Sequence, residues 1–509
     1  MKALLVFPNY GTNPSFSPAM QLLSALLKRE GLEVELFHLH EKMGFPLDKK
    51  FLQEQYTMSK PDIVFFTCTS FEYKLVNEIA GWLKEAQETT DHTPFFLGGF
   101  HAITVPQDLP ASNFDGFCIG EGELQIVELV NKIRNNEDYT GTYSFHFKNV
   151  DTIKANPLGK TVVNLDDLPD FDWDLFDTQR LIDQRSGWIS MQFSRGCVYN
   201  CTYCSVTAAK KLLYPDNLKD YLRTYSPERA VGMIEEVCKK FNFEKINFDD
   251  ELLPAYKQWM LKFCELYKER VLQKYNKRYI INSRANIMKE DVIKAMGESG
   301  CEEIRVGFET GNYLLRKDVL DKDITDEQLE NAYNLCRKYN IRGSAFMMMG
   351  VPGETKDTVK DSIRMVAKCK PYIIRLTFLF PFEHTPIYQY CLDRNLFKYP
   401  EGHHYKNFDY FTESSLVFKD LTDKEITRFK VMFPWFVNAW GFNQDEYTWL
   451  LLKWWDGNFR NQEVLNNMYE DDAAMSELMT ESHYRFFDSN RYIKYVEPKK
   501  ETQVLSVLA

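Results

Sequence analysis

The sequence predicts an α/β protein with an N-terminal doubly wound parallel sheet, a partial (β/α)6 barrel and a helical C-terminal element. Two observations lead to this fold class. Short apolar segments alternate with amphipathic ones over about residues 1–135, and again from about residue 186. Such alternation is typical of parallel sheets that are covered by helices. Polar or glycine-rich turns follow several of the apolar segments, at the sheet edge where α/β proteins bind ligands.

The N-terminal elements follow one another as strand and helix. Ser17 and Pro18 suit the first turn of a helix in "SPAMQLLSALLKREG", and Gly31 suits its end. A second helix is expected over "YKLVNEIAGWLKEAQ". The five expected strands are "KALLVFPN", "EVELFHLH", "PDIVFFTCTS", "PFFLGGFHAIT" and "FDGFCIGEGE".

The second half of the chain repeats the pattern. Ser226 with Pro227 and Thr325 with Gln328 mark two helix starts. Six strands are expected, in "WISMQFS", "KINFDD", "YIINSR", "EIRVGFET", "RGSAFMMMG" and "YIIRLTFLFPF". The predicted domains are residues 1–138, a connector at 139–185, a barrel at 186–400 and an aromatic-rich helical domain at 401–509.

Composition narrows the classes of function. Apolar residues make up 44% and charged residues 27% of the 509 positions, which is typical of a globular protein with sizeable cores. The net charge is −11 without a basic tract, so no nucleic-acid partner is expected. No segment reaches the roughly 18 consecutive apolar residues of a membrane span. Eleven cysteines without a secretion signal predict reduced thiols and a cytoplasmic location.

Three cysteines, Cys197, Cys201 and Cys204, lie within the segment "FSRGCVYNCTYCSV". A structural zinc site needs four ligands, and so does a ferredoxin-type cluster. Three thiolates on one loop instead suit a 4Fe–4S cube that leaves one iron open to a substrate. The loop follows the first expected barrel strand, so this cluster would lie at the carboxyl ends of the strands. The alternative is three unrelated thiols.

The C-x3-C-x2-C spacing, with Tyr203 before the last cysteine, resembles the motif of the radical S-adenosylmethionine (SAM) superfamily. The resemblance covers roughly residues 186–400, because "FDDELL", "INSRAN", "GCEEIRVGFETG", "MMMGVPGET" and "PFEHTPIY" follow in the order of that superfamily's strands. It implies a 4Fe–4S cluster whose open iron is chelated by SAM. An electron from the cluster cleaves the sulfonium to a 5′-deoxyadenosyl radical. A small-molecule substrate and an electron donor such as flavodoxin or ferredoxin are then expected.

Strand-end polar residues are candidates for binding SAM. Its amine favours a carboxylate, its own carboxylate favours the fork of Arg284, and its ribose favours Glu309. "FDDE" replaces the commoner Gly-Gly-Glu triplet, so three acids compete for the amine. These residues can instead form a solvated turn or cap helices. The predicted SAM-binding residues are Tyr203, Asp249, Asp250, Glu251, Ser283, Arg284 and Glu309.

The first domain resembles the Rossmann-like cobalamin-binding domain that precedes many radical SAM enzymes, through "LLVFPN", "TCTS", "GGFHAIT" and "DGFCIGEGE" in that order. Many cobalamin proteins carry D-x-H-x-x-G after the first strand, but the first histidine here is His38, so that cobalt ligand is missing. His101 is expected to be structural. The predicted cobalamin-binding residues are Asn9, Thr69, Ser70, Gly98, Gly99, Gly120, Glu121 and Gly122. The alternative is a domain that binds no corrinoid.

The resemblance implies methyl transfer to an unactivated carbon, or to phosphorus, of a small molecule. A second hypothesis is a cobalamin-associated radical cyclase or other rearranging oxidoreductase. A third is transfer of the 3-amino-3-carboxypropyl group without bound cobalamin, and a fourth is a non-catalytic iron–sulfur sensor. Methylthio transfer fits poorly because Cys68 and Cys118 make no second triad. The tryptophans at 435, 440, 454 and 455 would cover the substrate or simply pack.

Overall fold

The structure is a computed structural model that divides into two compact units. The first comprises Met1–Val198, Ala208–Asp250 and Leu266–Arg278, and the second comprises Tyr199–Thr207, Glu251–Glu265 and Tyr279–Ala509. The structure describes all residues except 12, 88–91, 151, 215–220, 254–255, 400–412, 442–483, 487–491 and 496–509. Trp454 and Trp455 therefore lie outside the described residues, as do the side chains of Trp435 and Trp440.

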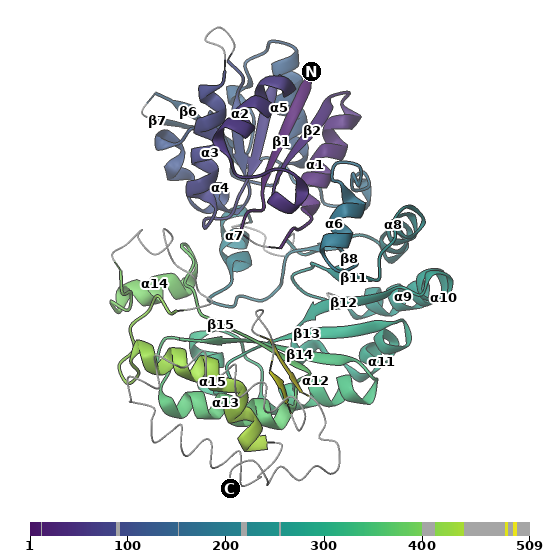
Figure 1. Ribbon diagram of the computed structural model, residues 1–509, viewed down its shortest axis with the longest axis vertical. Coiled ribbons are helices and arrows are strands. Elements are labelled where there is room, and N and C mark those ends of the chain that lie inside the picture. The colour runs from purple at the N-terminus through teal and green to yellow at the C-terminus, as the bar shows by residue number, and fades with distance from the viewer. Residues whose placement is uncertain are drawn as a thin grey trace. The chain divides into compact units, whose positions relative to one another are not determined.

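The first unit begins with a seven-stranded sheet of order β2-β1-β3-β4-β5-β6-β7 (Figure 1). The pairs from β2 to β5 are parallel, and β6 and β7 are antiparallel. The strands are β1 (Lys2–Pro8), β2 (Glu33–Leu39), β3 (Ile63–Thr67), β4 (Phe95–Gly98), β5 (Gly116–Cys118), β6 (Phe145–Asn149) and β7 (Thr152–Ala155). The helices are α1 (Pro18–Arg29), α2 (Lys49–Ser59), α3 (Tyr73–Glu85), α4 (Phe100–Thr104) and α5 (Glu123–Arg134).

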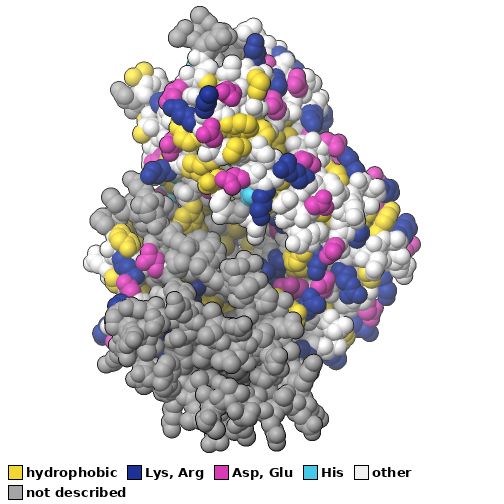
Figure 2. Space-filling model, viewed as in Figure 1, with side chains coloured by type: hydrophobic (Ala, Val, Ile, Leu, Met, Phe, Trp, Pro, Cys, Tyr) yellow, Lys and Arg dark blue, Asp and Glu magenta, His cyan; other side chains and the backbone are white. Residues whose placement is uncertain are grey.

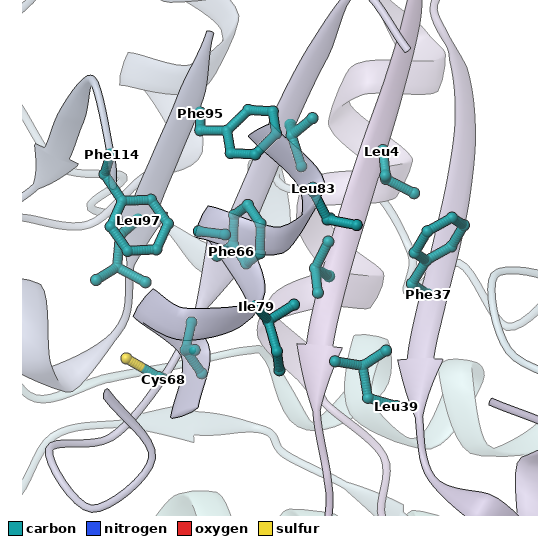
Figure 3. Close-up of a cluster of buried hydrophobic side chains, with 14 of the residues drawn as sticks. Leu4, Phe37, Leu39, Phe66, Cys68, Ile79, Leu83, Phe95, Leu97 and Phe114 are labelled. Atoms are coloured by element: carbon teal, nitrogen blue, oxygen red, sulfur yellow. The ribbon is translucent and has the colours of Figure 1, made fainter. Parts of the chain in front are cut away.

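Helices cover both faces of this sheet, as a doubly wound fold requires. One core packs α2, α3 and α4 against the face that carries Leu4, Phe66 and Leu97. Figure 3 shows Ile79 and Leu83 of α3 among these strand side chains. A second core packs α1 and α5 against Leu5, Phe65 and other residues of the opposite face. The predicted doubly wound sheet is confirmed.

The hairpin of β6 and β7 lies inside the segment that we expected to be a connector. Both strands are short, β6 buries only Phe145 and Phe147, and β7 is mostly exposed, so the apolar periodicity extends over only three residues. The rest of the first unit contains α6 (Thr178–Gln184), β8 (Trp188–Met191), β9 (Ser194–Arg195), β10 (Arg223–Thr224), α8 (Pro227–Lys240), β11 (Lys245–Phe248) and α10 (Gln273–Tyr275). β8 pairs with β11 in parallel, and β9 pairs with β10 antiparallel.

The second unit is built on four successive parallel strands, β12 (Arg278–Ser283), β13 (Cys301–Glu309), β14 (Arg342–Met349) and β15 (Ile373–Phe378). β17 (Tyr492–Tyr495) pairs antiparallel with β15, and β16 (Tyr484–Phe486) with β17. Its remaining helices are α11 (Glu290–Glu298), α12 (Asp326–Lys338), α13 (Lys356–Cys369), α14 (Pro386–Asp393) and α15 (Asp423–Gly441). Two helices, α7 (Ser205–Leu213) and α9 (Lys257–Tyr267), run from one unit into the other.

All six predicted barrel strands are present, as β8 and β11 to β15. The expected helix starts are confirmed as well. Ser17 accepts a hydrogen bond from the amide of Met20 ahead of Pro18, and Thr325 forms a capping box with Gln328. Among the described residues, no helix is both long and apolar enough to span a bilayer. Acidic and basic side chains are mixed over the described surface in Figure 2.

Candidate functional site

The loop with the first cysteine is fixed by close backbone packing in the first unit. Gly196, which directly precedes Cys197, has a φ of +87°, and a Cβ there would collide with the carbonyl oxygen of Tyr221. Only glycine fits this position without strain. The buried ammonium of Lys210, on α7, donates a hydrogen bond of 3.2 Å to the carbonyl oxygen of Cys197. The backbone around Cys197 is therefore held from two directions.

The other two cysteines lie in the second unit. Cys201 is buried, and Cys204 is half-buried. Between them, the amide of Thr202 donates to the carbonyl oxygen of Leu320 at 3.0 Å. The carbonyl of Thr202 accepts from the amide of Ile387, also at 3.0 Å. These two bonds tie the loop to the segment after β13 and to the start of α14.

Arg284 lies beside the second cysteine. It directly follows β12, and its Nη1 donates to Cys201 Sγ at 3.3 Å. Its guanidinium lies 4.0 Å from the ring centroid of Tyr199, and its Nε donates to Asn286 at 3.0 Å. Asn286 in turn donates to the Tyr199 hydroxyl at 3.0 Å. The guanidinium is thus held in one orientation, in contact with a thiol of the motif.

Tyr203, Glu309 and Lys322 form a compact polar cluster in the same unit. Glu309 Oε1 accepts from the Tyr203 hydroxyl at 2.9 Å and from Lys322 Nζ at 2.6 Å. Lys322 Nζ also lies 3.2 Å from the Tyr203 oxygen. Burial, followed by the negative charge of Glu309, raises the pKa of Tyr203. The cluster joins the cysteine loop to the carboxyl end of β13, where Glu309 has a strained φ of +65°.

A close approach at Gly307 explains why this position is glycine. A Cβ on Gly307 would collide with Lys322 Nζ and would lie 2.5 Å from Glu309 Oε1. Any larger residue would therefore displace the ion pair. The sequence "VGFETG" has a glycine here because two charged side chains cross the strand at this point.

The three predicted acids after β11 differ in their surroundings. Asp250 is fully buried and accepts hydrogen bonds from the amide of Phe193 and the hydroxyl of Ser194, at 3.0 and 2.5 Å. Asp249 and Glu251 are exposed. Asp250 therefore braces the segment that leads to the cysteine motif, whereas the Asp249 carboxylate accepts a hydrogen bond from the side-chain amide of Asn247.

The donor set fits a 4Fe–4S cluster and SAM. Among the described residues, no three His, Cys, Asp or Glu side chains gather around a single ion position. A 4Fe–4S cluster requires a different arrangement, because each thiolate binds a different iron. In the second unit, two of the three cysteines lie near Tyr203, Arg284 and Glu309. The hydroxyl of Ser283, just before Arg284, is buried and has no hydrogen-bond partner within the described part of the chain, as expected of a group that awaits a ligand.

The N-terminal sheet has polar side chains at the carboxyl ends of its parallel strands. Asn9, after β1, accepts from the Ser15 amide at 2.6 Å and contacts His38 at 3.1 Å. Burial lowers the pKa of His38 to about 4, so it is neutral at physiological pH. Its Nδ1 has no hydrogen-bond partner among the described residues. This edge therefore keeps a neutral imidazole with an unused nitrogen, which suits an uncharged amide of a ligand.

The loop after β3 lies against His101. Ser70 Oγ is 3.2 Å from His101 Nδ1, and Asp108 Oδ2 is 3.4 Å from His101 Nε2. The imidazole stacks on Tyr73 with 3.7 Å between ring centroids. Thr69 has another role, because its amide and hydroxyl both donate to Glu72. His101 thus supports Ser70 from within the domain, which agrees with the structural role that we expected.

Of the predicted glycines, two are explained by packing inside the domain. Gly99 has a φ of +87°, and a Cβ would lie 2.6 Å from Thr67 Oγ1. A Cβ on Gly120 would lie 2.8 Å from Ser144 Oγ. Gly98 and Gly122 have no neighbour within 3.6 Å of an added Cβ. At Gly99 and Gly120, two of the predicted cobalamin-binding glycines, the close approach is therefore made by the protein itself.

Glu121 has its carboxylate surrounded by donors. Arg223 contacts both of its oxygens, Arg195 reaches Oε2 at 3.2 Å, and the Tyr214 hydroxyl donates to Oε1 at 2.8 Å. Arg195 also pairs with Glu123 at 2.5 Å. Because Arg195 lies two residues before Cys197, this network links the end of β5 to the start of the cysteine motif. A further ligand at the Glu121 carboxylate would have to displace an arginine.

The comparison with family models decides the assignment. Residues 191–366 match the model described as "Radical SAM superfamily". Residues 191–366 are a radical SAM domain. Its matched segment begins at the end of β8 and contains all three cysteines, Arg284 and Glu309. The superfamily consists of enzymes that use SAM and a 4Fe–4S cluster, and the thiols and strand-end side chains described above fit those cofactors.

Two relatives show how far the similarity extends along the chain. An uncharacterized methyltransferase of Pyrococcus horikoshii is 24% identical over 340 residues, which cover 66% of this chain and 70% of the relative. The anaerobic magnesium-protoporphyrin IX monomethyl ester cyclase of Cereibacter sphaeroides is 26% identical over 410 residues, which cover 77% of this chain and 64% of the relative.

Two solved structures share the fold. The radical SAM methyltransferase TsrM of Kitasatospora setae, with tryptophan and a SAM analogue bound, has a TM-score of 0.65 at 19% identity. The match covers 77% of this chain and 76% of that chain. The cobalamin-dependent SAM radical enzyme OxsB, with aqua-cobalamin and SAM bound, has a TM-score of 0.65 at 16% identity. It covers 94% of this chain and 73% of that chain. The predicted sheet-plus-barrel fold class is confirmed.

Sequence reasoning missed the partners of several predicted residues. Lys322 lies in the polar segment "RKDVLDKDIT", where no periodicity distinguishes it. Tyr199 lies inside the cysteine motif, and Asn286 lies two residues beyond Arg284. Both residues could have been predicted from these positions next to predicted site residues. Arg195 was another, as a cation that directly precedes the Gly-Cys pair of the motif.

Proposed function

We propose that the protein is a cobalamin-dependent radical SAM methyltransferase that acts on an unactivated carbon, or on phosphorus, of a small molecule. The observation that carries the proposal is the cluster of Cys201, Tyr203, Arg284 and Glu309 at the strand ends of a radical SAM domain. A doubly wound sheet with polar strand ends precedes that domain in the chain. Methyltransferase relatives and the cobalamin-bound TsrM and OxsB structures support the same function.

The bound cluster would supply one electron to the SAM sulfonium, whose S–C5′ bond then breaks to give methionine and a 5′-deoxyadenosyl radical. Cys197, Cys201 and Cys204 would hold the cluster. Glu309, fixed by Tyr203 and Lys322 through one oxygen, would present its other oxygen to the ribose hydroxyls. Asp249 and Glu251 are the proposed partners of the SAM amine.

Cobalamin, where bound, would supply the methyl carrier between one SAM and the substrate. At the strand ends of the N-terminal sheet, Ser70 and the neutral His38 offer polar groups to its amides. No histidine precedes His38, so the loop after β1 supplies no imidazole to the lower face of the cobalt. An electron donor such as flavodoxin or ferredoxin is part of the proposal, because SAM cleavage consumes an electron.

The decisive experiment is anaerobic reconstitution of the full chain with iron and sulfide, with and without hydroxocobalamin. SAM and a chemical reductant are then added, and the nucleosides are measured by mass spectrometry. We expect 5′-deoxyadenosine in both samples, and S-adenosylhomocysteine only in the sample with cobalamin. No SAM cleavage in a sample that holds the cluster would contradict the proposal and would favour an iron–sulfur sensor.

A radical cyclase is the second candidate, because the relative with 26% identity is a magnesium-protoporphyrin monomethyl ester cyclase. The same experiment separates the two functions. A cyclase would give 5′-deoxyadenosine without S-adenosylhomocysteine, whether or not cobalamin is present. Methylthioadenosine would instead indicate transfer of the 3-amino-3-carboxypropyl group.

A further inference from the structure

We propose that Arg284 tunes the reduction potential of the cluster through a hydrogen bond to the Cys201 thiolate, beyond any contact that it makes with SAM. The inference rests on the proposed function, since it requires a cluster on the cysteine motif. Its basis is the 3.3 Å distance between Arg284 Nη1 and Cys201 Sγ, which is within the normal range for a nitrogen donor and a sulfur acceptor.

Both partners are buried, so solvent screens the charge of this contact only weakly. Arg284 is 6% exposed and Cys201 is 8% exposed. A guanidinium remains charged at any physiological pH, and solvent screens a buried charge much less than an exposed one. A permanent positive charge therefore lies against one of the three sulfurs that would carry the cluster.

The orientation of the guanidinium is set by the protein rather than by a ligand. Tyr199 lies under its plane, with 4.0 Å from the guanidinium carbon to the ring centroid. Asn286 accepts from Arg284 Nε and donates to the Tyr199 hydroxyl, each at 3.0 Å. Because Tyr199 and Asn286 orient the side chain, the contact with sulfur exists before SAM arrives.

The consequence for the cluster follows from charge. Reduction adds one electron to the cube, and part of that negative charge falls on the thiolate sulfurs. Hydrogen bonds to these sulfurs and nearby positive charge stabilise the reduced form and raise the potential. Loss of the Arg284 contact should make the cluster harder to reduce, even when SAM is absent.

The test is a redox titration of the reconstituted full-length protein without SAM, in which the EPR signal of the reduced cluster is measured at each potential. In Arg284→Met we expect the ratio of reduced to oxidised cluster at a fixed potential to fall about tenfold, a shift of about 59 mV to more negative potential. Arg284→Lys keeps the charge but loses the planar fork, so an intermediate value is expected. The control is Arg364→Met, which removes a half-exposed arginine of α13 and should leave the midpoint unchanged.

A second variant keeps the inference testable if Arg284→Met assembles no cluster. Tyr199→Leu removes the aromatic platform and leaves the arginine in place, so a smaller shift in the same direction is expected. Iron and sulfide content must match the wild type in each variant compared. An unchanged or higher midpoint in these variants would overturn the inference while the proposed function stands. A wild-type protein that binds no cluster would overturn both.

Discussion

At the scale of single residues, the buried ion pair of Lys322 and Glu309 leads to a prediction in which effects on protein stability and on SAM binding can be measured separately. The two residues are 6% and 7% exposed, and their charged atoms are 2.6 Å apart. Lys322→Met would leave a buried carboxylate without its cation, at a cost of about 3–5 kcal/mol. We expect a lower melting temperature and a weaker affinity for SAM, measured by calorimetry on the reconstituted protein.

The double variant Lys322→Met with Glu309→Gln is the matched control for this pair. It removes both charges, so most of the lost stability should return, while SAM affinity should stay low because the carboxylate that we propose for the ribose is gone. Recovery of SAM affinity in the double variant would show that Glu309 does not bind the cofactor.

Gly307→Ala should weaken SAM binding as well, because its methyl group would displace the Lys322 ammonium.

Glu354 gives a second prediction, based on pH. It is buried in the turn after β14, and burial raises its pKa to about 8, against the smaller opposing effect of the amides of Gly350 and Val351. In the unfolded chain the same carboxyl has its ordinary pKa of 4.5. Between these two pH values the folded state binds more protons than the unfolded state, so stability falls as pH rises. The slope is at most about 1.4 kcal/mol per pH unit.

Replacement of Glu354 by glutamine should remove this slope. We expect the melting temperature of Glu354→Gln to change less than that of the wild type between pH 5.5 and pH 7.5, measured by scanning calorimetry. Glu425→Gln is the control. Hydrogen bonds from Thr422 and Lys356 outweigh burial and lower the pKa of Glu425, so that group titrates below the window. Equal slopes for the wild type and Glu354→Gln would contradict the prediction.

At the scale of elements, the turn after β5 makes a prediction about Glu121. Its carboxylate holds Arg195, Arg223 and Tyr214, so Glu121→Ala would leave a buried arginine without its anion. We expect the free energy of unfolding to fall by about 3–5 kcal/mol, which would lower the melting temperature of the protein without its cofactors. The control is Glu128→Ala on α5, whose surface pair with Lys132 is worth less than about 1 kcal/mol.

This variant also tests the sequence-based expectation that Glu121 binds cobalamin. The absorbance spectrum of added hydroxocobalamin reports binding separately from stability. A large loss of affinity in Glu121→Ala, with an unchanged melting temperature, would favour the original expectation over the structural role described here.

The strands and the helix starts were predictable because they rest on local pattern. Buried strands such as Ile63–Thr67 are apolar up to their last residue, and caps such as Thr325 with Gln328 need only neighbouring residues. The hairpin Phe145–Asn149 and Thr152–Ala155 was missed because its strands are short and the second one is mostly exposed. In the site, the spacing of the cysteines and the positions of Arg284 and Glu309 at strand ends led to their prediction. The ion pair of Glu309 with Lys322 is a tertiary contact, which no periodic pattern in the sequence predicts.

At the scale of the whole molecule, two compact units contain different parts of one cysteine motif. Cys197 belongs to the first unit, whereas Cys201 and Cys204 belong to the second. The N-terminal sheet has its own two cores on opposite faces. We therefore expect it to keep its structure and its ligand when the cluster is lost.

Replacement of all three cysteines by alanine tests this independence. The variant should bind no 4Fe–4S cluster and form no 5′-deoxyadenosine, yet its absorbance titration with hydroxocobalamin should match the wild type. Cys238→Ala, which removes a half-buried thiol of α8 outside the motif, should keep a full complement of iron. Loss of cobalamin binding in the triple variant would mean that the cysteine loop helps to form the corrinoid site. The network from Arg195 to Glu121 would then be the physical route for that coupling, because it joins the strand before Cys197 to the end of β5.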